Sequence, residues 1–186
     1  MSHEKVVQDS KKSMEKGLHN FQEEMAKIRT GRASVSLLDD VRVEYYGSQV
    51  PLNQVATLST PESRLIVIAP WDKSAISAIM KAIQKADLGL QPVDDGKVVR
   101  LSLPPLTEER RKDIVKMAKK IAEESRVAIR NVRRDGNEHL KKIQKSGDMS
   151  EDDLRRSEHS IQELTDDFIK KVDESLQKKE KEIMEI

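Results

Sequence analysis

Cysteine is absent from the 186-residue sequence, and aromatic side chains are scarce, with one Trp, two Tyr and two Phe. Without cysteine the chain has no disulfide, no thiol nucleophile and no cysteine-ligated zinc, which fits a reducing compartment. Because rings are so few, a platform that binds single-stranded nucleic acid by stacking is not expected. No run of about 18 apolar residues could span a membrane, and the charged N-terminus lacks the apolar core of a signal peptide. We therefore expect a cytoplasmic protein without membrane association.

Motifs for metal binding, nucleotide binding and catalysis are also missing. The four histidines are scattered and form no HExxH or i, i+4 pair, so no metal site is expected. Neither G-x-x-x-x-G-K-S/T nor G-x-G-x-x-G occurs, so any nucleotide hydrolysis must belong to a partner. Residues 87–97 contain acids and glycines but not the ligand spacing of a calcium loop, and we interpret them as an ordinary loop. We expect no cofactor and no enzymatic activity.

Charge, in contrast, is abundant and unevenly distributed. The 34 basic and 33 acidic residues give a net charge of only +1. Residues 106–145, however, hold 13 basic and 7 acidic side chains, whereas residues 146–186 hold 7 and 13. This order predicts that the basic and acidic segments pack against each other, while the basic segment keeps one flank for an outside partner.

Three segments have the apolar spacing of long amphipathic helices. The first runs from about residue 2 to 29 and is expected to end at Gly31, which suits the position just after a helix. The second runs from residue 107 to about 145, and the third begins at the capping-box-like pair Ser150 and Asp153. Because the break between them is short, these two helices are expected to be antiparallel.

The sequence of the second long helix also predicts which of its residues are buried. At about 100° per residue, its apolar and small residues fall along one side, where Gly136 is interpreted as a point of close helix packing. The stripe comprises Ile114, Ala118, Ile121, Ser125, Ala128, Val132, Gly136 and Ile143, with Met117, Ile129 and Leu140 beside it.

Between residues 33 and 105 the pattern changes to short β-like runs. Residues 41–46 and the segment around Pro51 predict a hairpin that turns at Gly47 and Ser48. Residues 54–60 predict another strand, and the mostly apolar run at 64–70 predicts a central one. A helix capped by Asp72 is expected from about residue 73 to 86. A last strand is expected at residues 97–104.

Together these elements predict an α+β protein. Residues 1–30 and 105–186 are expected to form a long antiparallel three-helix bundle, with residues 31–104 inserted as a small β/α/β domain. Two short linkers join the parts, and two parallel linkers form a hinge with a limited set of directions. The hinge residues are expected to be Thr30, Gly31, Arg32, Ala33, Leu103, Pro104, Pro105 and Leu106.

A row of arginines lies on the second long helix. Arg126, Arg130 and Arg133 recur at i, i+4 and i+7, with Arg134 beside them, and on a helical wheel they point roughly 120° away from the apolar stripe. Four guanidinium groups are therefore expected on one exposed flank, and their planar forks suit phosphates. The row is a candidate RNA- or DNA-binding surface. In the alternative reading, the face is merely solvated and its arginines pair with nearby carboxylates. Those carboxylates are Glu123, Glu124, Asp135 and Glu138.

Six segments of the chain together resemble the bacterial ribosome recycling factor family. They are KIRTGRAS (27–34), VEYYG (43–47), DLGL (87–90), LPPLTEERRKD (103–113), RVAIRNVRRD (126–135) and SEDDLRR (150–156). The resemblance covers nearly the whole chain in collinear order, and the run from PPLTEERR to NVRRD is highly specific.

The resemblance implies a two-domain, L-shaped molecule with roughly the outline of tRNA, whose long arm is the three-helix bundle. Members of the family act after translation termination. With elongation factor G, which hydrolyses GTP, they split the ribosome into subunits and release mRNA and tRNA. The bundle lies on ribosomal RNA of the large subunit, and the small domain faces the elongation factor. The large subunit and elongation factor G are therefore the expected partners, and we expect a monomer.

The resemblance also implies roles for single residues. Arg130, Arg133 and Arg134 are expected to make the principal contacts with ribosomal RNA. The supporting residues are Arg126, Arg110 and Arg111 on the same helix, and Arg29 and Arg32 beside the linker.

Two other classes of function compete with this interpretation. A helical-bundle adaptor without RNA binding also needs long amphipathic helices, but it explains neither the arginine row nor the inserted domain. An enzyme with a small α/β domain needs a group of polar catalytic residues, and the sequence contains no such group. The salt dependence of binding distinguishes RNA binding from the adaptor, because phosphate contacts weaken steeply as salt rises.

Overall fold

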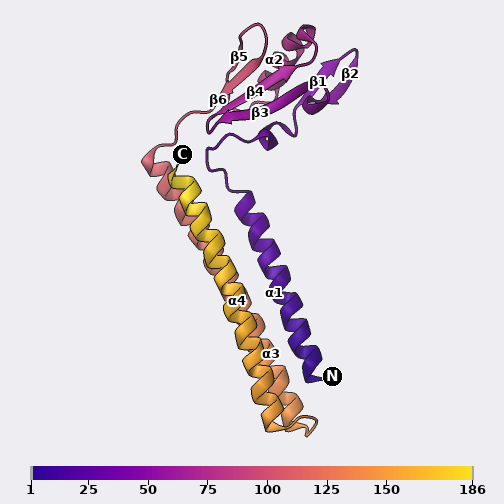
Figure 1. Ribbon diagram of the computed structural model, residues 1–186, viewed down its shortest axis with the longest axis vertical. Helices are drawn as coiled ribbons and strands as arrows, with labels where there is room; N and C mark the ends of the chain where they lie inside the picture. The colour runs from indigo at the N-terminus through magenta and orange to yellow at the C-terminus, as the bar shows by residue number, and fades with distance from the viewer. Residues whose placement is uncertain (1, 186) are drawn as a thin grey trace. The chain divides into compact units, whose positions relative to one another are not determined.

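The computed structural model describes residues 2–185, which divide into two compact units (Figure 1). Residues 2–29 and 108–185 form the first, which we call the helical unit, and residues 30–107 form the second, the small unit. The α+β class predicted from the sequence, with a long-helix bundle and an inserted β-containing part, is confirmed.

Three long helices make up the helical unit: α1 (His3–Ala26), α3 (Glu108–Lys145) and α4 (Glu151–Met184). α3 and α4 are antiparallel, and α1 packs against both of them. Their shared core contains the fully buried Met14, Ile129, Leu140, Ile161 and Ile183. The buried positions of α4 recur mainly at steps of three or four residues, which is the spacing of a bundle seam.

Local sequence signals explain the turn between α3 and α4. α3 is followed by Gly147 with φ +83°, a left-handed conformation that glycine adopts without steric cost. Ser150 then begins α4 as predicted: its Oγ accepts a hydrogen bond from the Asp153 backbone N–H at 3.1 Å and donates one to Asp153 Oδ2 at 2.7 Å. The two helices are therefore joined by a short, hydrogen-bonded turn.

The structure corrects two details of the predicted helices. α1 ends at Ala26 rather than near residue 29, so Gly31 is not the residue that follows its cap. The buried sector of α3 is rotated from the predicted stripe: Ala122 is fully buried, whereas Ala128 and Met117 are exposed. Alanines on neighbouring sides of a helix are equally apolar, so only the positions of α1 and α4 decide which one is covered.

The small unit contains two antiparallel sheets and one α-helix. A two-stranded hairpin consists of β1 (Arg42–Tyr45) and β2 (Ser48–Pro51). A four-stranded sheet, ordered β3-β4-β6-β5, consists of β3 (Ala56–Glu62), β4 (Leu65–Pro70), β5 (Pro92–Asp94) and β6 (Val99–Ser102). The helix is α2 (Ile76–Lys85), and single 3-10 turns lie at Val35–Leu38, Leu52–Gln54 and Lys73–Ala75.

The core of the small unit lies between α2 and the sheets. Ile66 and Ile68 of β4 are fully buried, as are Val99 and Leu101 of β6, and they share one cluster with Ile79 of α2. β4 is central, as its apolar sequence predicts. Asp72 caps the start of the helical segment by accepting a hydrogen bond from the Ser74 backbone N–H at 3.0 Å.

Two predictions in this unit were inaccurate. The β1–β2 hairpin turns at Tyr46 and Gly47, one residue earlier than expected, and both have positive φ (47° and 78°), as a two-residue type I′ turn requires. Residues 92–94 form β5 within the segment interpreted as a loop. This strand has only three residues and begins with Pro92, so its own sequence does not predict it; pairing with β6 creates it.

Candidate nucleic-acid interface

α3 and α4 are joined along one seam by polar contacts from α3. Their α3 members lie seven or eight residues apart, which places them on one edge of the helix. They are Arg111 Nη1 to Met184 O (3.1 Å), Lys119 Nζ to Glu180 Oε1 (3.8 Å), Arg126 Nε to Asp173 Oδ1 (2.8 Å), Arg133 Nη1 to Gln162 Oε1 (3.2 Å) and Lys141 Nζ to Glu158 Oε1 (3.9 Å). Basic α3 thus packs on acidic α4, as their opposite charges predict, and part of the basic charge of α3 is used inside the molecule.

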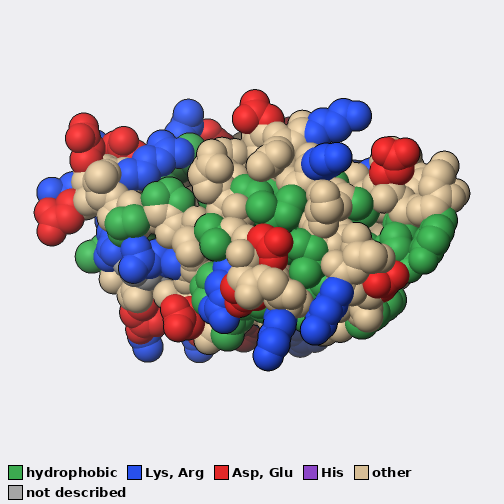
Figure 2. Space-filling view, turned by 90° about the horizontal axis from the view of Figure 1, so that it is seen from above, with side chains coloured by type: hydrophobic (Ala, Val, Ile, Leu, Met, Phe, Trp, Pro, Cys, Tyr) green, Lys and Arg blue, Asp and Glu red, His purple; other side chains and the backbone are tan. Residues whose placement is uncertain are grey.

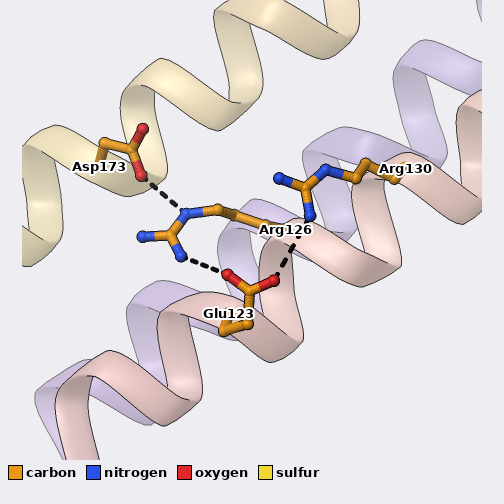
Figure 3. A network of polar contacts seen from close by, with 4 residues as sticks. All are labelled: Glu123, Arg126, Arg130 and Asp173. Carbon is orange, nitrogen blue, oxygen red and sulfur yellow. Dashed lines mark hydrogen bonds and ion pairs between the residues drawn. The ribbon is translucent and has the colours of Figure 1, made fainter. Parts of the chain in front are cut away.

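Arg126 is held in this seam by two carboxylates. Its Nε donates to Asp173 Oδ1 at 2.8 Å and its Nη1 donates to Glu123 Oε2 at 2.6 Å, so two carboxylates face one guanidinium group (Figure 3). Only 20% of the side chain is exposed. The hydrogen bond from Arg126 is also the main reason that the pKa of Glu123 lies below its ordinary value. The expected exposed position of Arg126 is therefore wrong, and the alternative of carboxylate pairing holds for this residue.

Arg130 and Arg133 are held far more loosely. Arg130 makes one long contact, from Nη1 to Glu123 Oε1 at 3.4 Å, and 39% of its side chain is exposed. Arg133 donates one hydrogen bond to the side-chain oxygen of Gln162, a neutral amide that leaves the positive charge uncompensated. Each guanidinium group has five N–H donors, so most of them remain available to a ligand.

Arg134 is the most available of the four. It is exposed, and within residues 2–185 no hydrogen bond or ion pair is found for its side chain. We call Arg130, Arg133 and Arg134 the open arginines. They lie on neighbouring turns of one rigid helix, so they can contact successive phosphates of a folded RNA without rearrangement of the backbone.

Two lysines that the sequence analysis did not single out extend this surface. Lys112 precedes Arg130 by 18 residues, and Lys116 precedes Arg134 by the same number, which is five complete helical turns. Because of this spacing, each lysine points in the same direction as its arginine, about 27 Å away along α3. Both lysines are exposed. The 18-residue spacing could have been found in the sequence. It was missed because it relates lysines to arginines and because the lysines lie outside the arginine cluster.

The other predicted RNA-binding residues have different surroundings. Arg110 is exposed at the start of α3, whereas Arg111 is half-buried and donates to the Met184 carbonyl. Arg29 follows α1 in the helical unit and is exposed. Arg32 is also exposed but belongs to the small unit. Arg111 therefore resembles Arg126 as a residue of the α3–α4 seam.

The predicted hinge residues all belong to the small unit. At the inner ends of the two segments, the Ala33 N–H donates to Ser63 O at 2.7 Å and the Leu103 N–H donates to Arg64 O at 2.8 Å. Both ends are thus fixed to the turn between β3 and β4. The positions left for a hinge are residues 30–32 and 104–106, where Gly31, with φ +78°, lies directly against Leu106.

Other kinds of site find little support. In the part of the chain that the structure describes, no three His, Asp or Glu side chains are grouped to hold a metal ion, and no helix is long and apolar enough to cross a membrane. The face seen from above in Figure 2 mixes hydrophobic, basic and acidic side chains, and neither charge forms a continuous field there. The exposed basic line of α3 is the feature that most resembles a binding surface.

Comparison with known proteins agrees in sequence and in fold. Residues 21–184 match a family described as "Ribosome recycling factor". The chain is 54% identical over 186 residues to the ribosome-recycling factor of Nitratidesulfovibrio vulgaris, covering 100% of both chains, and 55% identical over 181 residues to that of Bacillus subtilis, covering 97% of this chain and 98% of the relative.

Two solved structures are similar over almost their full length. One is a solution structure of the ribosome recycling factor, with a TM-score of 0.74 and 42% identity, covering 100% of this chain and 99% of that one. The other belongs to models of the T. thermophilus ribosome recycling factor and E. coli elongation factor G bound to the E. coli post-termination complex. Its TM-score is 0.62 at 46% identity, covering 98% of this chain and 99% of that one.

Proposed function

Because the chain belongs to the ribosome recycling factor family, we propose that it binds the post-termination ribosome and, with elongation factor G and GTP, splits it into subunits and releases mRNA and tRNA. A related factor has been described together with elongation factor G on the post-termination complex, which supports these partners for this chain. In this proposal elongation factor G hydrolyses the GTP, the chain itself supplies no catalytic group, and it acts as a cytoplasmic monomer.

The observation that carries the proposal is the set of open arginines on α3. Arg130, Arg133 and Arg134 are the principal residues that bind ribosomal RNA of the large subunit, and Lys112 and Lys116 extend the contact along the helix. Such contacts go to phosphates and need no base recognition. A factor that must bind, act and leave benefits from this kind of binding, because phosphate contacts form quickly and break without unstacking bases.

The two units divide the work in this proposal. The helical unit, residues 2–29 and 108–185, binds RNA, and the small unit, residues 30–107, responds to elongation factor G. Because α3 and α4 are long and packed against each other, and packed interiors have low compressibility, they can transmit a displacement along the bundle. The two linkers, around Gly31 and Pro105, then act as a hinge that restricts the direction in which the small unit moves.

A subunit-splitting assay tests the proposal. Purified post-termination ribosomes are mixed with the protein, elongation factor G and GTP, and dissociation is followed by light scattering. Splitting is expected only when all three components are present. Binding to purified large subunits, measured separately, is expected to weaken steeply between about 50 and 200 mM salt. If binding does not depend on salt and the ribosomes are not split into subunits, the adaptor function is supported instead.

A further inference from the structure

We propose that Glu123 is an internal competitor of ribosomal RNA: its carboxylate holds Arg130 in the free protein, is displaced by an RNA phosphate on binding, and thereby limits the affinity for the large subunit. This inference rests on the proposed function and adds a residue that sets how tightly the factor binds. Its basis is the network formed by Glu123, Arg126, Arg130 and Asp173 in Figure 3.

The two oxygens of Glu123 have unequal partners. Oε2 accepts from Arg126 Nη1 at 2.6 Å, a short charge-assisted hydrogen bond, while Oε1 accepts from Arg130 Nη1 at 3.4 Å. Arg126 is in turn held by Asp173 of α4 at 2.8 Å. The carboxylate is therefore fixed in place through Arg126, and it remains beside Arg130 whether or not Arg130 stays in contact with it.

The geometry favours competition over positioning. A residue that positions Arg130 for RNA would hold its guanidinium group by short or paired hydrogen bonds. Glu123 makes one long contact with one nitrogen, and 55% of its own side chain is exposed. Contacts of this kind between exposed charges are weak, so a phosphate can replace the carboxylate at little cost.

The charge balance of the network points in the same direction. Arg126 and Arg130 contribute two positive charges, and Glu123 and Asp173 contribute two negative ones, so the network is neutral as a whole. Asp173 already compensates Arg126 from α4. The charge of Glu123 therefore subtracts from the field of the open arginines, at the point where an RNA phosphate would lie beside Arg130.

The substitution Glu123→Gln tests the inference. The amide oxygen can still accept from Arg126, but the negative charge is gone, so binding to purified large subunits at moderate salt is expected to become about two- to fivefold tighter. Glu124→Gln is the matched control. Glu124 is exposed on the same turn, points about 100° away on the helix, and loses the same charge. It is expected to change binding much less.

A second pair of variants assigns the effect to Arg130. In an Arg130→Ala background, Glu123→Gln is expected to lose most of its effect, because the residue that the carboxylate holds is gone. The inference is overturned if Glu123→Gln and Glu124→Gln bind large subunits equally well, or if Glu123→Gln binds more weakly than the wild type. In either case the proposed function stands as long as the wild-type protein binds. Failure of the wild-type protein to bind large subunits would overturn both. Melting temperatures confirm that the variants are folded.

Discussion

Gly136 of α3 lies against Ser10 of α1 so closely that a Cβ atom at residue 136 would be 2.7 Å from Ser10 Oγ. The same atom would be 3.0 Å from Ile161 Cδ1 of α4. All three residues are buried. No side chain fits at residue 136 unless its neighbours move, which confirms the interpretation that this glycine serves close helix packing.

Gly136→Ala is therefore expected to lower the melting temperature of the helical unit. Alanine improves helix propensity by about 1 kcal/mol, but the overlap with Ser10 and Ile161 costs about 1–3 kcal/mol and outweighs it. Gly17→Ala is the control, because nothing lies within 4 Å of an added Cβ at this position of α1. That variant should be more stable by about 0.5–1 kcal/mol. Thermal unfolding followed by circular dichroism compares the two, and a stabilised Gly136→Ala would refute the packing argument.

Two glycines of the small unit allow a similar comparison. Gly31 and Gly47 both have φ +78°, but an added Cβ at Gly31 would be 2.7 Å from Leu106 Cγ, whereas at Gly47 it would meet nothing within 4 Å. Gly47→Ala should cost about 1–2 kcal/mol from backbone strain alone, and Gly31→Ala should cost more. Adding Leu106→Ala to Gly31→Ala removes the overlap. The stability cost of Gly31→Ala should then come closer to that of Gly47→Ala. Urea unfolding followed by the fluorescence of Trp71, the single tryptophan, measures the small unit.

Arg134 and Arg126 should respond to alanine in opposite ways. Arg134→Ala removes an exposed charge, so it should weaken binding to large subunits and lower the slope of log K against log salt by about one, with an unchanged melting temperature. Arg126→Ala removes a side chain that is only 20% exposed, together with its charge-assisted hydrogen bonds to Asp173 and Glu123, and should lower the melting temperature instead. If Arg134→Ala melts early, or if Arg126→Ala loses only binding, the division between open and engaged arginines is wrong.

Acid should weaken the turn between β5 and β6 through Asp95. Its carboxylate accepts from the Val98 N–H at 2.8 Å, the Lys97 N–H at 3.1 Å and Arg100 Nε at 3.1 Å. These bonds lower the pKa of Asp95 from 3.8 to about 2. Since the folded state has the lower pKa, the stabilisation is complete above about pH 4 and is lost as the pH falls toward 2.

The substitution Asp95→Asn should therefore destabilise the small unit at pH 7, and the stability of the variant should fall less than that of the wild type between pH 4 and pH 2. Urea midpoints from Trp71 fluorescence, measured across this range, give both quantities. Asp94→Asn is a neighbouring control with the same change of charge. An identical acid dependence in wild type and Asp95→Asn would show that other groups govern this transition.

Much of the fold was predictable because its signals are local and repeated. Ser150 marks the start of α4, and apolar residues at regular spacing indicate its buried face. An apolar run indicates that β4 is a central strand. β5 and the rotation of the α3 core were not predictable, since each depends on a partner. Pairing with β6 creates the first, and the positions of α1 and α4 decide the second.

The candidate site divides in the same manner. The arginine row is visible in the sequence because its members lie at helical spacing on one segment. The division of the row into open and engaged residues is not visible in the sequence. Arg126 contacts Asp173 across a sequence separation of 47 residues, and Arg133 contacts Gln162 across 29 residues. These partners depend on how α4 is aligned along α3, and no local pattern specifies that alignment.

The interrupted order of the bundle matters while the chain is being made. α1 is complete at Ala26, but α3 begins only at Glu108, so the apolar side of α1, with Met14 and Phe21, leaves the exit tunnel without a docking surface. At about 5–20 residues per second, several seconds pass before one exists. During that interval the nascent α1 is the segment most exposed to association with other chains, whereas α3 and α4 emerge last and find each other as immediate neighbours.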